Sequence, residues 1–186
     1  MASEAGGAGN TRVTLAELNR CSAAAFADCL GSVFEHAGWV ARAAAAQRPF
    51  ADADALHGAM LGVLRALPED TLVAFLCGHP ELAGAAARTG SMTGDSVREQ
   101  GGLALGGLPP EAAAQWDRLN AAYRARFGFP FILCIVRHSR DSALAAFGER
   151  LGRSRAEELA AAVEEIGHIS RLRLALRVAE PADSQA

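Results

Sequence analysis

Apolar residues recur along the chain at the three- and four-residue spacing of an α-helix, in runs that Gly or Pro interrupts. Thr14 and Glu17 have the spacing of a capping box, and the apolar face that follows them extends to Trp39, which we expect in the core. The last run begins in the same way, with Ser154 and Glu157. The spacing predicts these helical units: 14–39, 56–67, 72–76, a short helix from Pro80, a helix from Thr93, 110–127, 144–151 and 154–177.

The composition favours the same fold class. Of the 186 residues, 51% are apolar, mainly Ala and Leu rather than β-branched or aromatic residues. The length fits one domain with a core of its own and is short for two. We therefore predict an all-α, single-domain compact bundle of about eight helices over residues 12–178, between flexible tails at 1–11 and 179–186.

Charge and hydropathy narrow the partners and the compartment. The formal net charge is -3 without a basic block, so no nucleic acid is expected as a partner. The strongest apolar run, 127–136, contains Gly128 and Pro130 and is too short to span a membrane. The first ten residues lack the basic start and the apolar run of a secretion signal, which favours a cytoplasmic protein.

The cysteines and the missing lysine limit the possible cofactors. Cys21, Cys29, Cys77 and Cys134 are far apart and lie among apolar residues, so we expect buried free thiols and no metal site. All 18 basic residues are arginine. A protein Schiff base is therefore impossible, which excludes pyridoxal-phosphate and class I aldolase chemistry. A Walker-type phosphate loop would lack its lysine.

The candidate chemistry lies in the stretch CGHPELAG and in the helix after it. His79 precedes Pro80, which is expected to open a new helix, and the positive end of that helix would favour a neutral imidazole. Glu99 and Gln100 follow Ser96 by three and four residues and share one helix face with it. An imidazole beside such a face fits acid–base catalysis. A capping role for His79 and an ordinary helix-start pairing of Ser96 with Glu99 are the structural alternatives.

One arginine stands out on the last helix. At about 100° per residue, Arg173 falls in the middle of the apolar stripe that contains Ile166 and Ile169. An arginine that faces a core needs an anionic or carbonyl partner, because burying its charge unpaired is costly. Two readings are equally supported by the pattern: an internal salt bridge to an Asp or Glu, and a contact to a ligand.

Five motifs stand in a fixed order along the chain: RPF (48–50), HPELAG (79–84), MTxxSxxEQ (92–100), LNxxYxxxFGFPFI (119–132) and EIxxIxxLRL (165–174). In order and spacing they resemble the OHCU decarboxylases, enzymes that act on 2-oxo-4-hydroxy-4-carboxy-5-ureidoimidazoline (OHCU) in urate breakdown. The resemblance covers about residues 14 to 178.

The resemblance implies an all-α decarboxylase that needs no cofactor or metal, yields (S)-allantoin and forms a homodimer. It implies catalytic roles for His79, Glu99 and Arg173. It also implies substrate contacts, partly through the backbone, at a second set of positions: Pro80, Ser96, Gln100, Phe131, Ile132, Leu133, Cys134 and Ile135.

The chain departs from the family pattern at Gly38, where Pro is usual, at Met92, where Leu is usual, and at Leu103-Ala104-Leu105. These departures bear on local backbone shape and packing more than on the chemistry. Two other functions stay open: an inactive relative that serves as a helical binding module, and a helical regulator that resembles the family by chance. The regulator would need a basic recognition helix, which the sequence does not show.

Overall fold

The computed structural model describes residues 12–89, 91–101 and 107–179. Ten α-helices lie in this part of the chain, eight of them with seven or more residues, which confirms the predicted all-α fold. The helices are α1 (Leu15–Arg20), α2 (Ala23–Leu30), α3 (Gly38–Ala44), α4 (Ala53–Arg65), α5 (Glu69–Leu76), α6 (Ala85–Thr89), α7 (Gly94–Gly101), α8 (Pro110–Phe127), α9 (Arg140–Arg150) and α10 (Arg155–Arg177). Two 3-10 turns, η1 (Ala45–Gln47) and η3 (Ile135–Arg137), and two strands, β1 (Val13–Thr14) and β2 (Val178–Ala179), complete the described elements.

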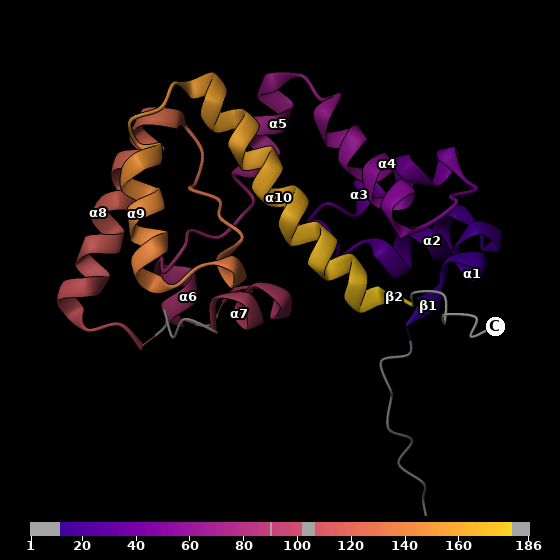
Figure 1. Ribbon diagram of the computed structural model, residues 1–186, viewed down its shortest axis with the longest axis horizontal. Helices are drawn as coiled ribbons and strands as arrows, with labels where there is room; N and C mark the ends of the chain where they lie inside the picture. The colour runs from indigo at the N-terminus through magenta and orange to yellow at the C-terminus, as the bar shows by residue number, and fades with distance from the viewer. Residues whose placement is uncertain (1–11, 90, 102–106, 180–186) are drawn as a thin grey trace, which may run out of the picture.

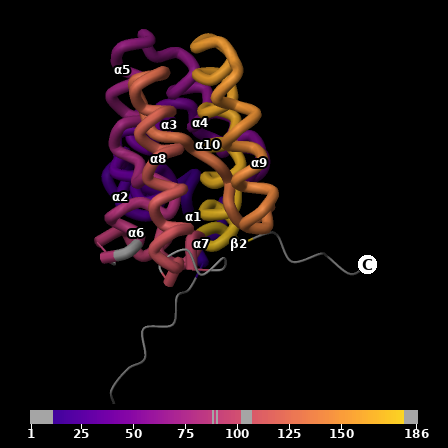
Figure 2. The backbone as a smooth tube through the Cα atoms, turned by 90° about the vertical axis from the view of Figure 1, so that its left-hand side faces the viewer, coloured from indigo at the N-terminus to yellow at the C-terminus, as the bar shows by residue number. Residues whose placement is uncertain are grey.

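Helix α10 runs through the middle of the molecule, with α1–α4 on one side and α8 and α9 on the other (Figure 1). Figure 2 looks onto the α8 side and shows α9 and α10 next to each other. The capping box predicted at Ser154 and Glu157 opens α10, and the one at Thr14 and Glu17 opens α1. Because α10 contacts α2, α4 and α8, it joins the two halves of the protein.

The two ends of the described chain meet in a short parallel strand pair. Val13 pairs with Val178, and Thr14 pairs with Ala179. The sequence pattern does not predict this pairing, because a two-residue strand is too short to show an alternation of apolar and polar positions. Apart from Ala179, the predicted tails lie outside the described residues. None of the helices in the described ranges has the length and apolarity needed to cross a bilayer.

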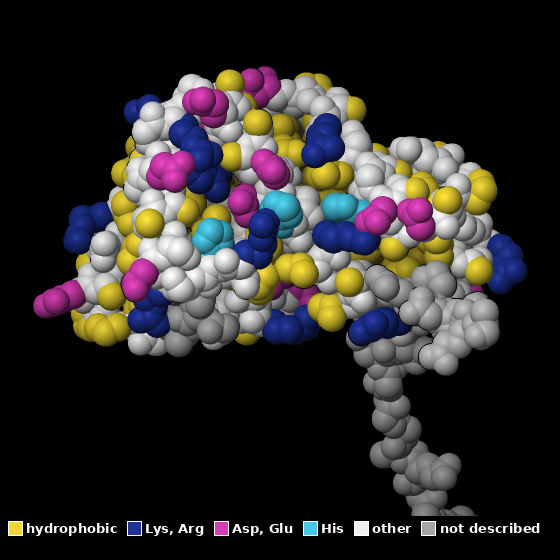
Figure 3. All heavy atoms as spheres, in the orientation of Figure 1, with side chains coloured by type: hydrophobic (Ala, Val, Ile, Leu, Met, Phe, Trp, Pro, Cys, Tyr) yellow, Lys and Arg dark blue, Asp and Glu magenta, His cyan; other side chains and the backbone are white. Residues whose placement is uncertain are grey.

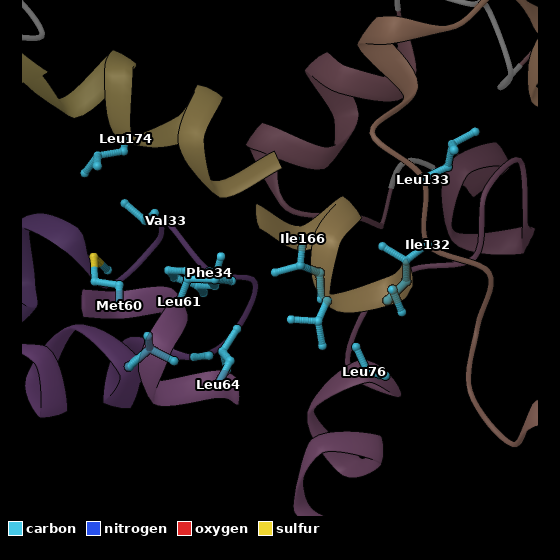
Figure 4. Packing of buried hydrophobic residues seen from close by; sticks show 14 of the residues in the cluster. Val33, Phe34, Met60, Leu61, Leu64, Leu76, Ile132, Leu133, Ile166 and Leu174 are labelled. Carbon is cyan, nitrogen blue, oxygen red and sulfur yellow. The ribbon is translucent and has the colours of Figure 1, made fainter. Parts of the chain in front are cut away.

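The core packs on both sides of α10. In Figure 4, Leu61 of α4 lies beside Phe34, while Ile166 of α10 and Ile132 lie close together in another part of the cluster. Gly167 lets α4 and α10 approach each other, since a Cβ atom at this position would lie 3.2 Å from a methyl carbon of Leu61.

The predicted unit 14–39 is divided, and its last residue is placed differently from our expectation. The side chain of Ser22 accepts a hydrogen bond from the Ala25 N–H and begins α2, and turns separate α2 from α3. Trp39 lies in the first turn of α3 and is 40% exposed, so the prediction of a core residue is wrong. Its ring packs against Phe75 in an edge-to-face arrangement, with 6.2 Å between the ring centroids.

The four cysteines are free thiols, as predicted, but only Cys134 is buried. Cys21 is half-buried, and Cys29 and Cys77 are exposed. On the short helix α2 the buried side is formed by Phe26, Ala27 and Leu30, which leaves Cys29 on the outer face. Apolar neighbours in the sequence therefore did not indicate which face of a helix carries the thiol.

Candidate active site

One pocket takes in nearly all of the predicted site residues. It is formed by the loop after α5, one face of α7, the segment 131–135 and helix α10, and its cavity volume is about 40 Å³. Its lining residues are His79, Pro80, Leu82, Ser96, Glu99, Gln100, Phe131, Ile132, Leu133, Ile135, Ile169 and Arg173. Cys134 is the predicted site residue that does not line it. Leu82 and Ile169 were not predicted, because in the sequence they look like ordinary core residues.

The loop that carries His79 is fixed by side chains and not by a new helix. The prediction that Pro80 begins a helix is wrong, since the next helix, α6, begins at Ala85. Asn120 Nδ2 donates to the Leu82 carbonyl at 2.9 Å, and the Ala83 N–H donates to Gln100 Oε1 at 3.1 Å. These bonds supply the partners that a helical turn would have supplied. They hold the pocket loop in a shape that local sequence preference alone would not select.

His79 is a neutral imidazole at neutral pH. Burial lowers its pKa to about 4, and the charge of Arg173 acts in the same direction. Glu35 and the backbone carbonyls of Phe75 and Leu76 act in the opposite direction but do not outweigh burial. The sequence pattern predicted the neutral form through a helix dipole, whereas in the structure desolvation is the cause. The ring nitrogen Nδ1 is buried and has no hydrogen-bond partner among the described residues.

Arg173 forms a buried salt-bridge cluster. Its Nε and Nη2 donate to the two carboxylate oxygens of Glu99 at 2.7 and 2.8 Å, and Nη1 donates to Glu35 Oε2 at 2.5 Å. Nη2 also donates to Ser96 Oγ at 3.3 Å. Burial lowers the pKa of Arg173, but the bonds and charges of Glu99 and Glu35 outweigh this and raise it. The structure therefore shows the internal salt bridge, and it places that salt bridge at the wall of the pocket.

Glu35 is the member of this cluster that sequence reasoning missed. Its side chain is 1% exposed and accepts hydrogen bonds from Thr93 Oγ1 at 2.7 Å, Ser96 Oγ at 3.1 Å and Arg173. Burial raises the pKa of Glu35, but the hydrogen bonds from Thr93, Arg173 and Ser96 leave it below its usual value. Glu35 lies between α2 and α3, where no helical period exists to indicate its direction.

The segment 131–135 forms a largely apolar part of the pocket wall. The ring of Phe131 stacks on Phe147 at a centroid distance of 3.8 Å, which anchors the start of the segment in the core. Burial raises the pKa of Cys134 to about 11, so this thiol is protonated at neutral pH. It is therefore not an activated nucleophile.

The pocket thus combines a neutral histidine, a buried arginine–carboxylate cluster and a largely apolar wall segment. Across the described ranges, no three His, Cys, Asp or Glu side chains lie close enough together to hold a metal ion. A neutral histidine beside an arginine–carboxylate cluster suits proton transfer on a small polar molecule better than covalent catalysis. These features define an all-α protein with a pocket whose groups suit acid–base chemistry.

Comparison with known proteins supplies the family. The family model described as "OHCU decarboxylase" matches residues 19–175. A 2-oxo-4-hydroxy-4-carboxy-5-ureidoimidazoline decarboxylase of Haloferax volcanii is 35% identical over 165 residues, which cover 89% of this chain and 96% of that protein. The uric acid degradation bifunctional protein PucL of Bacillus subtilis is 36% identical over 92% of this chain. The chain spans 34% of the length of PucL.

The fold is also that of a solved relative. The crystal structure of (S)-allantoin synthase matches with a TM-score of 0.70 and 26% identity, covering 90% of this chain and 54% of that chain. The chain belongs to the OHCU decarboxylase family, a family of carboxy-lyases.

Proposed function

We propose that the chain converts OHCU to (S)-allantoin in urate degradation, and that the pocket around His79 is where the reaction takes place. Family membership supports the reaction. The observation that supports the site is the neutral, buried imidazole of His79 in one pocket with Arg173 and Glu99. These three residues stand at the positions that the family resemblance implies.

The chemistry of the substrate explains why side chains suffice. Its carboxylate is bonded to a hydroxyl-bearing carbon that adjoins a C=N bond. When the bond to CO₂ breaks, the electron pair moves toward the ring nitrogen, so the substrate provides its own electron sink. The ring nitrogen takes up a proton from the solvent, the hydroxyl proton is lost as a carbonyl forms, and a proton is added to the carbon that bears the ureido group. We therefore propose that no cofactor or metal is required.

In this scheme His79 moves the proton. As a neutral imidazole it accepts the hydroxyl proton and can return one to carbon. Glu99, held by two bonds from Arg173, orients the imidazole or the ureido group. The face of the ring that receives the proton sets the configuration of the product. Ser96 and Gln100 hydrogen-bond the ring, each already oriented by a protein partner.

The charge of the cluster favours loss of the carboxylate. Glu35 and Glu99 carry two negative charges against the single positive charge of Arg173, so one negative charge is in excess. A substrate carboxylate beside this cluster is disfavoured, and its conversion to neutral CO₂ relieves the repulsion. Arg173 therefore acts by orienting Glu99 and not by gripping the departing carboxylate, which would stabilise the ground state.

We further propose a homodimer in the cytoplasm. Val136 is 55% exposed, and Leu172 and Leu176, one turn apart on α10, are 45% and 42% exposed. Exposed apolar side chains of this size suit contact with a second copy. Figure 3 shows hydrophobic side chains on the outer surface of the face in view. Light scattering after size-exclusion chromatography measures the state; a monomer of 19.3 kDa would refute it.

The test of the function uses freshly generated OHCU, whose decay is followed by ultraviolet absorbance. The wild-type protein should accelerate the decay and make the allantoin optically active. His79→Asn should lose about 10²–10⁴-fold in rate, the usual contribution of a general base. His168→Asn, outside the pocket on α10, is the matched control and should keep the wild-type rate.

The outcomes of this test distinguish an active decarboxylase from an inactive relative and test the role of His79. A wild-type protein that leaves the spontaneous decay unchanged would instead indicate an inactive relative that binds a ligand. Wild-type turnover in His79→Asn, with circular dichroism unchanged, would refute the catalytic assignment of His79.

A further inference from the structure

The segment 131–135 separates the His79 pocket from a second hollow. Leu133 lines both spaces. The second hollow is lined by charged and histidine side chains, among them Arg150, Glu164 and Glu165. On the face in Figure 3, acidic, basic and histidine side chains gather over α9 and the middle of α10. Residues 131–134 belong to no helix or strand, so no regular structure fixes their peptide groups.

Two charged side chains bind this segment from the side of the second hollow. Glu165 accepts a hydrogen bond from the Cys134 N–H at 2.7 Å, and Arg150 Nη1 donates to the Ile132 carbonyl at 2.8 Å. Arg150 is held in turn by the fully buried Glu158, with Nη2 and Oε2 2.9 Å apart. The two bonds flank Leu133 on either side along the chain.

The geometry of the peptide bond means that these two hydrogen bonds also determine where the N–H and the carbonyl of Leu133 point. In a trans peptide the C=O and the following N–H point in opposite directions. Because the Ile132 carbonyl points to Arg150, the Leu133 N–H points away from it. Because the Cys134 N–H points to Glu165, the Leu133 carbonyl points away as well. In the described part of the chain, neither backbone group of Leu133 has a hydrogen-bond partner.

We propose that Glu165, supported by Arg150, is a positioning residue that turns the N–H and the carbonyl of Leu133 together toward the His79 pocket. One donor and one acceptor side by side match the adjacent N–H and C=O of an amide or urea edge. OHCU carries such an edge in its ureido group and ring, so this inference rests on the proposed function. Glu165 thereby contributes to substrate recognition without touching the substrate.

The test distinguishes the role of Glu165 as a hydrogen-bond acceptor from an effect of its charge and from a purely structural role. Glu165→Ala should raise KM about tenfold, the effect of losing one hydrogen bond to a charged group, and leave kcat within about twofold. Glu165→Gln should restore KM to within about twofold of wild type, because its amide oxygen can still accept the Cys134 N–H. Glu164→Ala, an exposed neighbour on the same helix, is the matched control and should keep the wild-type KM.

A second variant removes the same hydrogen bond by changing its donor instead of its acceptor. Cys134 has a φ of -72°, which proline adopts, so Cys134→Pro removes the N–H donor at a position whose φ suits the proline ring. It should raise KM as Glu165→Ala does, and the double variant should be no worse than either single one. Binding of (S)-allantoin by titration calorimetry should weaken in parallel.

Three outcomes would overturn the inference. They are an unchanged KM in Glu165→Ala, a KM in Glu165→Gln as high as in Glu165→Ala, and a lowered melting temperature with KM unaffected. If the wild-type protein does not act on OHCU, the proposed function and the inference fall together. If the wild type is active and Glu165→Ala matches it, only the inference falls.

Discussion

Replacing Glu35 with Gln removes the buried charge that faces Arg173 while keeping the size of the side chain. The amide oxygen of the new side chain can still accept from the hydroxyls of Thr93 and Ser96, which lie 2.7 and 3.1 Å from Glu35 Oε1 in the wild-type protein. Its NH₂ group must then face Nη1 of Arg173, which donates to Glu35 Oε2 at 2.5 Å in the wild-type protein. Two donors would oppose each other inside the protein.

The expected loss of stability follows from the burial of the two charged side chains. The side chains of Glu35 and Arg173 are 1% and 5% exposed, so solvent screens their interaction little. Breaking such a buried pair costs about 3–5 kcal/mol. Because Glu99 still pairs with Arg173 through two bonds, we expect the lower end, about 3 kcal/mol. For a chain of this length that corresponds to a melting temperature lower by roughly 6–12 °C.

Urea unfolding followed by far-ultraviolet circular dichroism measures this cost, provided that the m value stays unchanged. Glu149→Gln is the matched control, since Glu149 is 70% exposed and pairs with Arg153 at 2.6 Å. It should cost no more than about 1 kcal/mol. If Glu35→Gln cost no more than Glu149→Gln, the buried cluster would not stabilise the fold and the reasoning would be wrong.

Two further predictions concern the pocket. Because the pKa of His79 is lowered to about 4, kcat/KM should fall only as the pH drops through about 4, where the imidazole becomes protonated and can no longer accept a proton. A rate profile with its acid limb near 6.5, the ordinary pKa of His, would contradict this, with circular dichroism at each pH as the check on folding. Gly84→Ala should lower kcat/KM by more than about tenfold, because the new Cβ atom would lie 2.8 Å from Cβ of Glu81 and distort the His79 loop. Its control is Gly58→Ala on α4, where nothing lies within 4 Å and activity should be unchanged.

Periodicity predicted the parts of the molecule that follow from local rules. The capping boxes at Thr14 and Ser154 are present, and α10 begins where the second one stands. The phase of α10 also predicted a buried Arg173, because the direction of a helical side chain follows from its position in the repeat. The sequence did not decide between a salt bridge and a ligand contact for Arg173, because only the three-dimensional structure shows which carboxylates lie beside it.

Periodicity did not predict residues whose position depends on distant partners. Glu35 contacts Thr93, Ser96 and Arg173, which lie 58, 61 and 138 residues away along the chain. The loop after His79 was predicted to become helical at once, because Pro80 suits the first turn of a helix. Long-range bonds from α7 and α8 to the loop outweigh that local preference.

Helix α10 carries both Glu165, which binds the apolar wall, and Arg173, which binds the charged cluster. The two residues are eight positions apart, which in an α-helix is a fixed rise of about 12 Å. Because one rigid helix binds both sides of the pocket, the distance between these two attachment points does not depend on the conformation of any loop. Enlarging the pocket for a longer substrate would therefore require changing side chains, because inserting a residue into α10 would rotate one attachment point away by about 100°.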